Sequence, residues 1–219
     1  MPNTNGRTGR PPMTSRAQIL SAARKLIDQD GWEKLTIRRL AAEVGIGATT
    51  LYHHVRDKED LLLLLLNEYA EQIPPADPRF ADPRLSDPRD RIVAAAITLH
   101  DSLAAWPWAA EVLTVDGFVG LLKTAALRPV EAILAAAVDS GRTREQAVEV
   151  FRAIWYYTVG EILVRARSGR KPADVDFGHF DPEVLPHLAA IGPQWPVIAA
   201  RDSYPAGLRA LVNGLTGGS

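Results

Sequence analysis

Residues 36–55 read TIRRLAAEVGIGATTLYHHV, and this stretch constrains the fold more than any other part of the chain. Apolar residues recur at helical spacing on both sides of Gly45, which favours two short helices joined by a tight turn. Seven apolar residues can form the shared core of such a pair: Ile37, Leu40, Ala41, Val44, Ile46, Leu51 and Val55. This length and punctuation are typical of a helix-turn-helix, although other helical hairpins share the pattern.

The second helix of the pair, expected from about Ala48 to His54, is short and polar outside its apolar positions. In a helix-turn-helix the second helix enters the major groove of DNA. Hydroxyl groups of Thr49 and Thr50 can bind a base or a phosphate, and Tyr52 can donate to a phosphate. The outward set of this helix is Gly47, Ala48, Thr49, Thr50, Tyr52, His53 and His54, flanked by Arg38 and Lys58.

The charge distribution agrees with an anionic partner at one end of the chain. The net charge is −1, yet residues 1–60 hold ten Lys and Arg against seven Asp and Glu. Residues 1–13 are expected to be a disordered arm in which Arg7 and Arg10 can reach a phosphate or a minor groove. A basic amino-terminal unit on an acidic body fits nucleic acid better than the total charge suggests.

Helical periodicity dominates the remaining sequence, and no alternating strand pattern of useful length appears, so we predict an all-α fold. Residues 74–90 contain Asp-Pro-Arg three times, and their prolines predict a linker whose last Asp-Pro starts the next helix. Thr143 and Gln146 form a predicted capping box. Further helices are expected over 15–30, 57–73, 89–105, 107–113, 117–140, 143–168, 181–191 and 205–212.

The segment TIRRLAAEVGIGATTLYHHVRDKEDLL resembles the DNA-binding domain of the tetracycline-repressor (TetR) family, and the resemblance covers roughly residues 14–66. It is carried by a Thr-capped helix, a Gly turn, a Leu-Tyr-x-His-hydrophobic run, a following Lys and a Leu-Leu pair. In this chain these are Thr36, Gly45, Leu51, Tyr52, His54, Val55, Lys58, Leu61 and Leu62.

The resemblance implies base contacts for Arg38, Ala48, Thr49 and Thr50, and phosphate contacts for Thr36, Tyr52, His54 and Lys58. One departure stands out, because the repressor after which the family is named has Gln-Pro where this chain has Ala48-Thr49. Alanine cannot hydrogen-bond to a base edge, so a different operator sequence is expected. The domains implied are a three-helix DNA-binding domain over 14–57 and a helical ligand-binding and dimerisation domain over 58–219.

The family's body pairs two helices with their twins in a four-helix dimer interface. Residues 143–168 carry apolar side chains on more than one stripe, and 205–215 adds Leu208, Leu211, Val212 and Leu215. A helix that is apolar on two faces must bury both. We predict a two-fold homodimer through these segments, which would read a palindromic operator, while burial of both faces within one subunit remains the alternative.

A ligand pocket in the body is a further expectation. Large side chains of the expected helices there could line an apolar cavity, with His100 and Glu161 as polar contacts, or could be ordinary core. The candidates are His100, Trp106, Phe118, Leu122, Trp155 and Tyr156. A bound small-molecule effector would shift the dimer toward a form that no longer fits the operator, with the 58–73 helix as lever.

Several classes of function lack support in the sequence. There is no cysteine, and the histidines lack metal-ligand spacing, so no metal or cofactor is predicted. The longest apolar run, Leu61–Leu66, is far short of a bilayer span, which with the absence of a signal peptide favours a cytoplasmic protein without membrane partners. No catalytic motif indicates an enzyme. The competing interpretation is a helical small-molecule-binding protein that does not bind DNA.

Overall fold

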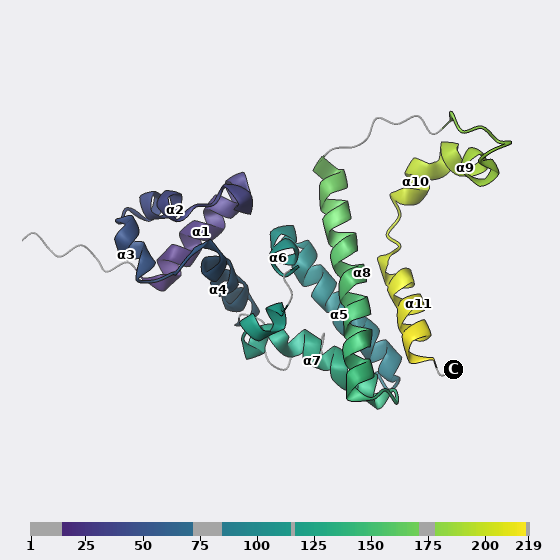
Figure 1. Cartoon of the computed structure of the whole chain (residues 1–219), viewed down its shortest axis with the longest axis horizontal. Coiled ribbons are helices and arrows are strands. Elements are labelled where there is room, and N and C mark those ends of the chain that lie inside the picture. The colour runs from purple at the N-terminus through teal and green to yellow at the C-terminus, as the bar shows by residue number, and fades with distance from the viewer. Residues whose placement is uncertain (1–14, 72–84, 115–116, 171–177, 218–219) are drawn as a thin grey trace, which may run out of the picture. The chain divides into compact units, whose positions relative to one another are not determined.

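The computed structural model describes residues 15–71, 85–114, 117–170 and 178–217, and the regular elements in these ranges are all helices (Figure 1). The predicted all-α class is therefore confirmed. Contacts divide the chain into two units, Met1–Ala70 and Glu71–Ser219. The predicted arm over 1–13 and most of the predicted linker over 74–90 lie outside the described residues.

The amino-terminal elements are α1 (Arg16–Asp30), η1 (Trp32–Lys34), α2 (Ile37–Val44), α3 (Ala48–Tyr52) and α4 (Lys58–Glu71). A capping box starts α1, because the Ser15 hydroxyl accepts from the Gln18 N–H while the Gln18 side chain accepts from the Ser15 N–H. Helix α2 packs on α1 and α3. Their core consists of Ile19, Leu20, Ala23, Leu26, Ile27, Leu40, Ala41 and Leu51.

Helix α4 groups with the three helices before it, so the division of the chain falls later than the expected boundary at 57/58. The reason is the apolar face of α4, where Leu61, Leu62 and Leu65 are almost fully buried. An ion pair between Arg24 and Glu68 (3.3 Å) also ties α1 to α4.

The carboxy-terminal unit contains α5 (Pro88–Ala104), α6 (Pro107–Val112), η2 (Phe118–Leu121), α7 (Thr124–Asp139), α8 (Arg144–Arg170), α9 (Pro186–Ile191), η3 (Gly192–Gln194), α10 (Trp195–Ala199) and α11 (Tyr204–Thr216). Asp87 caps α5 and Pro88 begins it, as predicted. Helices α5 and α8 both pack on α7 and α11. The core side chains include Ile92, Ala95, Ala96, Ile133, Ala137, Ile154, Leu208 and Val212.

The helix expected over 117–140 was wrong in its first third. Gly117 has φ +81°, a short 3-10 turn follows, and Leu122 is extended, so α7 begins only at Thr124. Leu122 and Lys123 both have extended backbone angles, which cannot belong to a helix, and this explains why α7 starts only after them.

The helix expected over 181–191 was also wrong in its first part, because α9 begins at Pro186. A residue before proline is driven out of the helical region, and Leu185 has φ −128° and ψ 60°. The elements η3 and α10 were not predicted from the sequence. No described helix is long and apolar enough to cross a membrane.

Candidate nucleic-acid interface

The turn between α2 and α3 has the local geometry that its sequence predicts. The Thr36 side chain caps α2 by accepting from the Arg39 N–H (3.2 Å). Gly45 ends α2 in the left-handed conformation, with φ 77°, and the Ile46 N–H bonds back to the Ala41 carbonyl (3.0 Å). The constraint at Gly45 is its backbone angle, because a Cβ there would meet no atom within 4 Å.

Helix α3 separates its apolar and polar side chains cleanly. Leu51 is fully buried and Val55, just after the helix, is nearly so. Thr49, Thr50 and His53 are exposed, and Tyr52 keeps 54% of its surface accessible. The exposed side chains are hydrogen-bonding groups of the kind that contact bases and phosphates. Gly47 is also exposed, whereas Ala48 and His54 are half-buried.

The two adjacent arginines of α2 differ in their surroundings. Arg39 pairs with Asp30, so its charge is already neutralised by a neighbouring carboxylate. Arg38 is exposed, and no ion pair joins it to another residue of the described ranges. Arg38 is therefore the α2 cation that remains available to an anionic partner. Thr36, by contrast, already uses its hydroxyl as a helix cap.

Lys58 is held in a contact that the sequence analysis did not foresee. Its ammonium donates to the Glu33 carbonyl (3.1 Å) and lies over the Trp32 ring, 4.7 Å from the centroid. Partial burial lowers the pKa of Lys58 from its usual value. An ammonium has three donors, so this contact leaves capacity for a phosphate.

The loop from α3 to α4 is fixed by a short chain of carboxylate contacts. Asp57 caps α4 by accepting from the Asp60 N–H (2.8 Å). The backbone N–H of Arg56 donates to the Asp60 carboxylate (2.9 Å) and lowers the pKa of Asp60. These bonds set where α3 ends relative to α4, and thus hold Tyr52 and Lys58 in place.

Comparison with known proteins places this geometry in a family. Residues 19–65 match the sequence model described as "Bacterial regulatory proteins, tetR family". An HTH-type transcriptional regulator of Saccharopolyspora erythraea is 32% identical over 151 residues, which cover 69% of this chain and 61% of that protein. The repressor DrrR1 of Streptomyces coeruleorubidus is 29% identical over 224 aligned positions, covering 94% of this chain and 79% of the repressor. The chain belongs to the tetR family.

Solved structures of tetR-family proteins share the fold of both units. A possible TetR family regulator from Streptomyces coelicolor A3(2) aligns with TM-score 0.72 at 24% identity, over 92% of this chain and 98% of that one. BioQ in complex with its operator DNA aligns with TM-score 0.64 at 20% identity, over 94% and 99%. ActR of Streptomyces coelicolor bound to (S)-DNPA aligns with TM-score 0.69 at 19% identity, over 94% and 98%. At these identities the likeness establishes the fold.

The side chains predicted to line a ligand pocket in this tetR-family body differ in their surroundings. Trp155 is buried and stacks on Phe151, whereas its neighbour Tyr156 is 58% exposed and bonds to Arg152 (2.7 Å). Leu122 is half-buried. Trp106 packs beside Trp108, with ring centroids 5.7 Å apart, and the Phe118 side chain lies outside the described ones.

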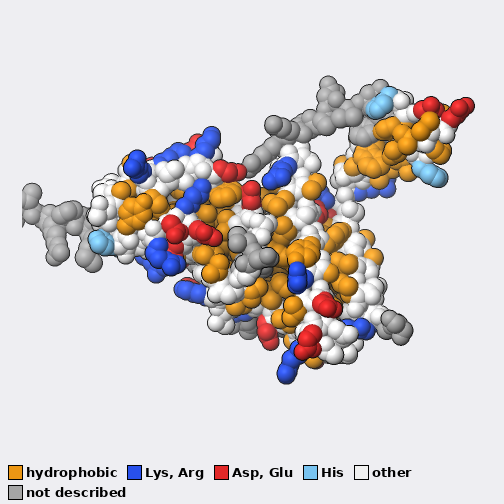
Figure 2. Space-filling view, viewed as in Figure 1, with side chains coloured by type: hydrophobic (Ala, Val, Ile, Leu, Met, Phe, Trp, Pro, Cys, Tyr) orange, Lys and Arg blue, Asp and Glu red, His pale blue; other side chains and the backbone are white. Residues whose placement is uncertain are grey.

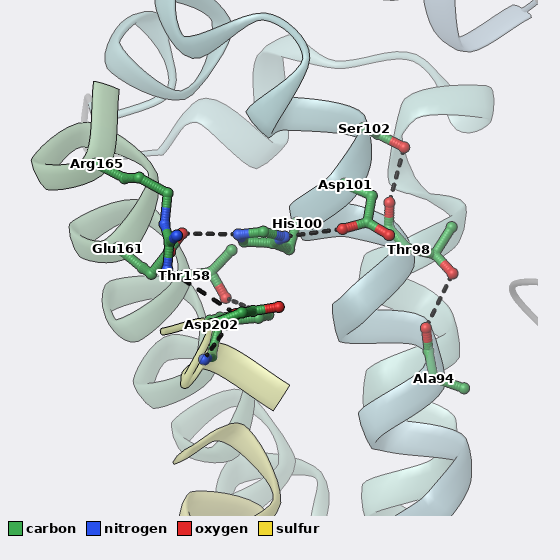
Figure 3. A network of polar contacts seen from close by, with 10 residues as sticks. Ala94, Thr98, His100, Asp101, Ser102, Thr158, Glu161, Arg165 and Asp202 are labelled. Atoms are coloured by element: carbon green, nitrogen blue, oxygen red, sulfur yellow. Dashed lines mark hydrogen bonds and ion pairs between the residues drawn. The ribbon is translucent and has the colours of Figure 1, made fainter. Parts of the chain in front are cut away.

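His100 and Glu161, predicted as polar contacts of a ligand, contact each other instead (Figure 3). The His100 Nε2 atom lies 2.7 Å from Glu161, and Nδ1 lies 2.9 Å from Asp101. Arg165 pairs with Glu161 from the next turn of α8 and approaches Asp202 (3.9 Å). The network joins α5 and α8 to Asp202, which lies two residues before the start of α11.

Tyr204 at the start of α11 completes this junction. Its ring stacks on His100, with centroids 4.0 Å apart, and its hydroxyl lies 2.8 Å from the Thr158 hydroxyl. Thr158 gives its single proton to the Ile154 carbonyl (2.7 Å), so Tyr204 is the donor to Thr158. Burial raises the pKa of Tyr204 to about 12, which keeps the phenol neutral. Across the described ranges, no three His, Asp or Glu side chains cluster as metal ligands.

Proposed function

We propose that this tetR-family regulator is a repressor that binds a palindromic operator as a homodimer and is released by a small-molecule effector. The observation that carries the proposal is the exposed polar face of α3, with Thr49, Thr50 and Tyr52 outward while Leu51 is buried. The unpaired Arg38 adds a cation on the preceding helix. BioQ, which shares the fold, has been solved with its operator. Binding to chromosomal DNA would put the protein in the cytoplasm.

In this proposal the bases are contacted by Arg38, Thr49 and Thr50. The small residues Gly47 and Ala48 allow the backbone to approach the groove. Tyr52, Lys58, His53 and His54 are proposed to contact phosphates. Thr36 serves the interface through its cap, which fixes the start of α2. Several phosphate contacts of this kind make the affinity for DNA fall steeply as the salt concentration rises.

The homodimer is proposed to form through the outer faces of α8 and α11. Every fourth residue of α8 from Val148 to Val164 is exposed, and the row includes Arg152 and Tyr156. On α11 the exposed row is Ala206, Ala210 and Gly214, whose small side chains allow a close helix approach. Leu208 and Val212 are buried within the subunit, so the outer face of α11 is left for a partner. Tyr and Arg are enriched among residues that dominate binding energy at interfaces.

The effector is proposed to enter the carboxy-terminal unit near the buried Trp155 and the half-buried His100 and Trp106. ActR, a protein of the same fold, was solved with (S)-DNPA. Opening the His100–Glu161 contact would free two polar groups for a ligand and loosen α5 on α8 at the same time. The effector would thus favour a dimer whose recognition helices no longer match two adjacent grooves.

Selection from a randomised duplex library tests the DNA and dimer parts together. The proposal expects enrichment of an inverted repeat with half-sites one helical turn apart or a multiple of it. Light scattering of the free protein should give twice the chain mass of 23.9 kDa, and the complex should give that mass plus the mass of one duplex. No enrichment over the input library would refute the DNA-binding part, and a monomer on the selected duplex would refute the dimer part.

For the effector, anilinonaphthalene sulfonate is a suitable planar aromatic probe. It should become fluorescent on the protein and should lower the anisotropy of the labelled selected duplex. Trp155→Ala should weaken the probe effect and leave duplex binding without probe unchanged. A probe that binds strongly with no effect on the duplex would count against an effector site in the body.

A further inference from the structure

The α9–α10 arm, defined here as residues 178–201, presents apolar side chains that its own chain does not cover. No residue of α9 or α10 is buried. Leu188 and Ile191 on α9 and Val197 and Ile198 on α10 are all exposed, Val197 by 67%. In Figure 2 hydrophobic side chains gather over the part of the chain that Figure 1 labels α9 and α10. Clustered exposed apolar side chains mark an interaction surface.

A second uncovered apolar surface lies between α7 and α8. It is an open groove of about 440 Å³ that includes Leu134, Val138 and Val148. Val138 is 41% exposed and Val148 48%. Val148 also begins the exposed row of α8 that runs through Arg152 and Tyr156, so the groove continues the proposed dimer face.

The arm and the groove belong to opposite ends of α8. The groove residue Ala147 lies near the start of α8, and the chain leaves this helix at Arg170, ~35 Å further along the axis at 1.5 Å per residue. The arm returns at Tyr204, whose hydroxyl bonds to Thr158 in the second half of α8. Both ends of the arm therefore start from the carboxy-terminal half of the helix, away from the groove of the same chain.

In the proposed dimer, a two-fold axis perpendicular to α8 makes the two copies of this helix antiparallel. The carboxy-terminal half of one α8 then lies beside the amino-terminal end of the other, where the partner's groove is. The charges also match, because the groove carries Arg144 and Glu131 while the arm carries Glu183 and Arg201. None of these four forms an ion pair with another residue in the described part of the chain.

We propose that the α9–α10 arm of one subunit packs into the α7–α8 groove of a second copy of this chain, so that the two copies exchange arms. The inference rests on the proposed homodimer and adds the segment that completes it. Exchange buries the apolar side chains of both arms and both grooves, and it places Glu183 and Arg201 within reach of charges of opposite sign.

The absence of cysteine makes a direct test available. Val138→Cys places a thiol in the groove and Val197→Cys places one on the arm, both at exposed positions. The two single variants, one carrying an affinity tag, are mixed, allowed to exchange subunits and treated with a short bis-maleimide. The expected product is a cross-linked pair containing one tagged and one untagged chain, whereas Asp28→Cys with Val197→Cys gives none.

The double variant Val138→Cys/Val197→Cys separates the outcomes. Arm exchange predicts a product of dimer mass, and a product that stays at monomer mass would show that the arm occupies its own groove and would overturn the proposal. Absence of any cross-link would overturn it as well. Light scattering and duplex binding on the unmodified protein test the proposed function separately. If that protein is a dimer that binds DNA but the cross-link does not form, only the arm exchange is refuted.

Discussion

Helices α3 and α10 are both five residues long, yet they stand in opposite relations to their own chain. Helix α3 buries Leu51 completely and exposes hydroxyl groups. Helix α10 buries nothing and exposes Trp195, Val197 and Ile198. A helix this short is not stable alone, so tertiary contacts must hold each of them in place.

The contrast separates two kinds of binding surface. The packing of α3 is complete within one subunit, and what it leaves outside is polar, as a surface for the wet and charged grooves of DNA must be. The packing of α10 is incomplete within one subunit, and what it leaves outside is apolar, as a surface for another protein is. The same chain thus has one surface suited to nucleic acid and one suited to its copy.

The largest effect is expected from Leu51→Ala, which removes the anchor of α3. Loss of a fully buried leucine costs about 2–5 kcal/mol of unfolding free energy. Urea denaturation should show this loss, whereas the exposed Thr50→Ala should change stability by less than about 0.5 kcal/mol. Equal costs for the two variants would mean that α3 is not anchored in this way.

Val197→Asp tests the incomplete packing of α10. The substitution should weaken the dimer by about tenfold or more, because it puts a charge into an apolar contact between subunits. Concentration-dependent light scattering measures the change. His187→Asp, at an exposed polar position of the same arm, serves as the control. If both variants dimerise like the unmodified chain, the apolar face of α10 does not contribute to the dimer.

The adjacent arginines of α2 sharpen the comparison on the DNA side. Arg38→Ala should weaken binding to the selected duplex by about 1–3 kcal/mol, roughly 5- to 150-fold, at unchanged stability. Arg39→Ala breaks a partly exposed pair with Asp30, which is worth about 0–1 kcal/mol of stability. Anisotropy and urea unfolding separate the two effects. A larger binding loss from Arg39→Ala than from Arg38→Ala would reverse the assignment.

The smallest change in unfolding free energy is expected at Tyr204, which holds α11 on α8. Tyr204→Phe removes one donor to a buried hydroxyl and should cost about 1 kcal/mol, while Tyr52→Phe on exposed α3 should cost nothing measurable. The pH dependence offers a second check. The pKa of Tyr204 is raised from 10.0 to about 12, so the folded chain keeps a proton that the unfolded chain loses.

This contribution of Tyr204 is complete below pH 10 and is lost as the pH rises toward 12. Urea midpoints of the unmodified chain should therefore fall over this range. Tyr204→Phe should show a shallower fall, and an identical fall in both proteins would assign the effect to other groups.

The features that could be predicted from the sequence are those that short segments decide. Thr36 and Gly45 sit at the two ends of α2, and both act within four residues. The capping box of Thr143 and Gln146 forms as expected. The inward position of Leu51 follows from helical spacing alone.

The features that were missed depend on residues far apart in the chain or on a single backbone angle. Lys58 reaches η1 across 25 residues, and Tyr204 reaches Thr158 across 46. Neither pair has a local pattern that links its members. The late start of α7 follows from the extended backbone at Leu122 and Lys123, and that of α9 follows from Pro186; residue spacing alone does not reveal either. The pocket prediction grouped Trp155 with Tyr156, although neighbours on a helix point ~100° apart.

Hydrogen–deuterium exchange with the selected duplex is the most direct test of α3 as the DNA-contacting helix. Peptides covering residues 36–55 should exchange more slowly in the complex than in the free protein, with the strongest protection around Thr49, Thr50 and Tyr52. Duplex binding that leaves these peptides unchanged while slowing exchange elsewhere would contradict the assignment of the interface.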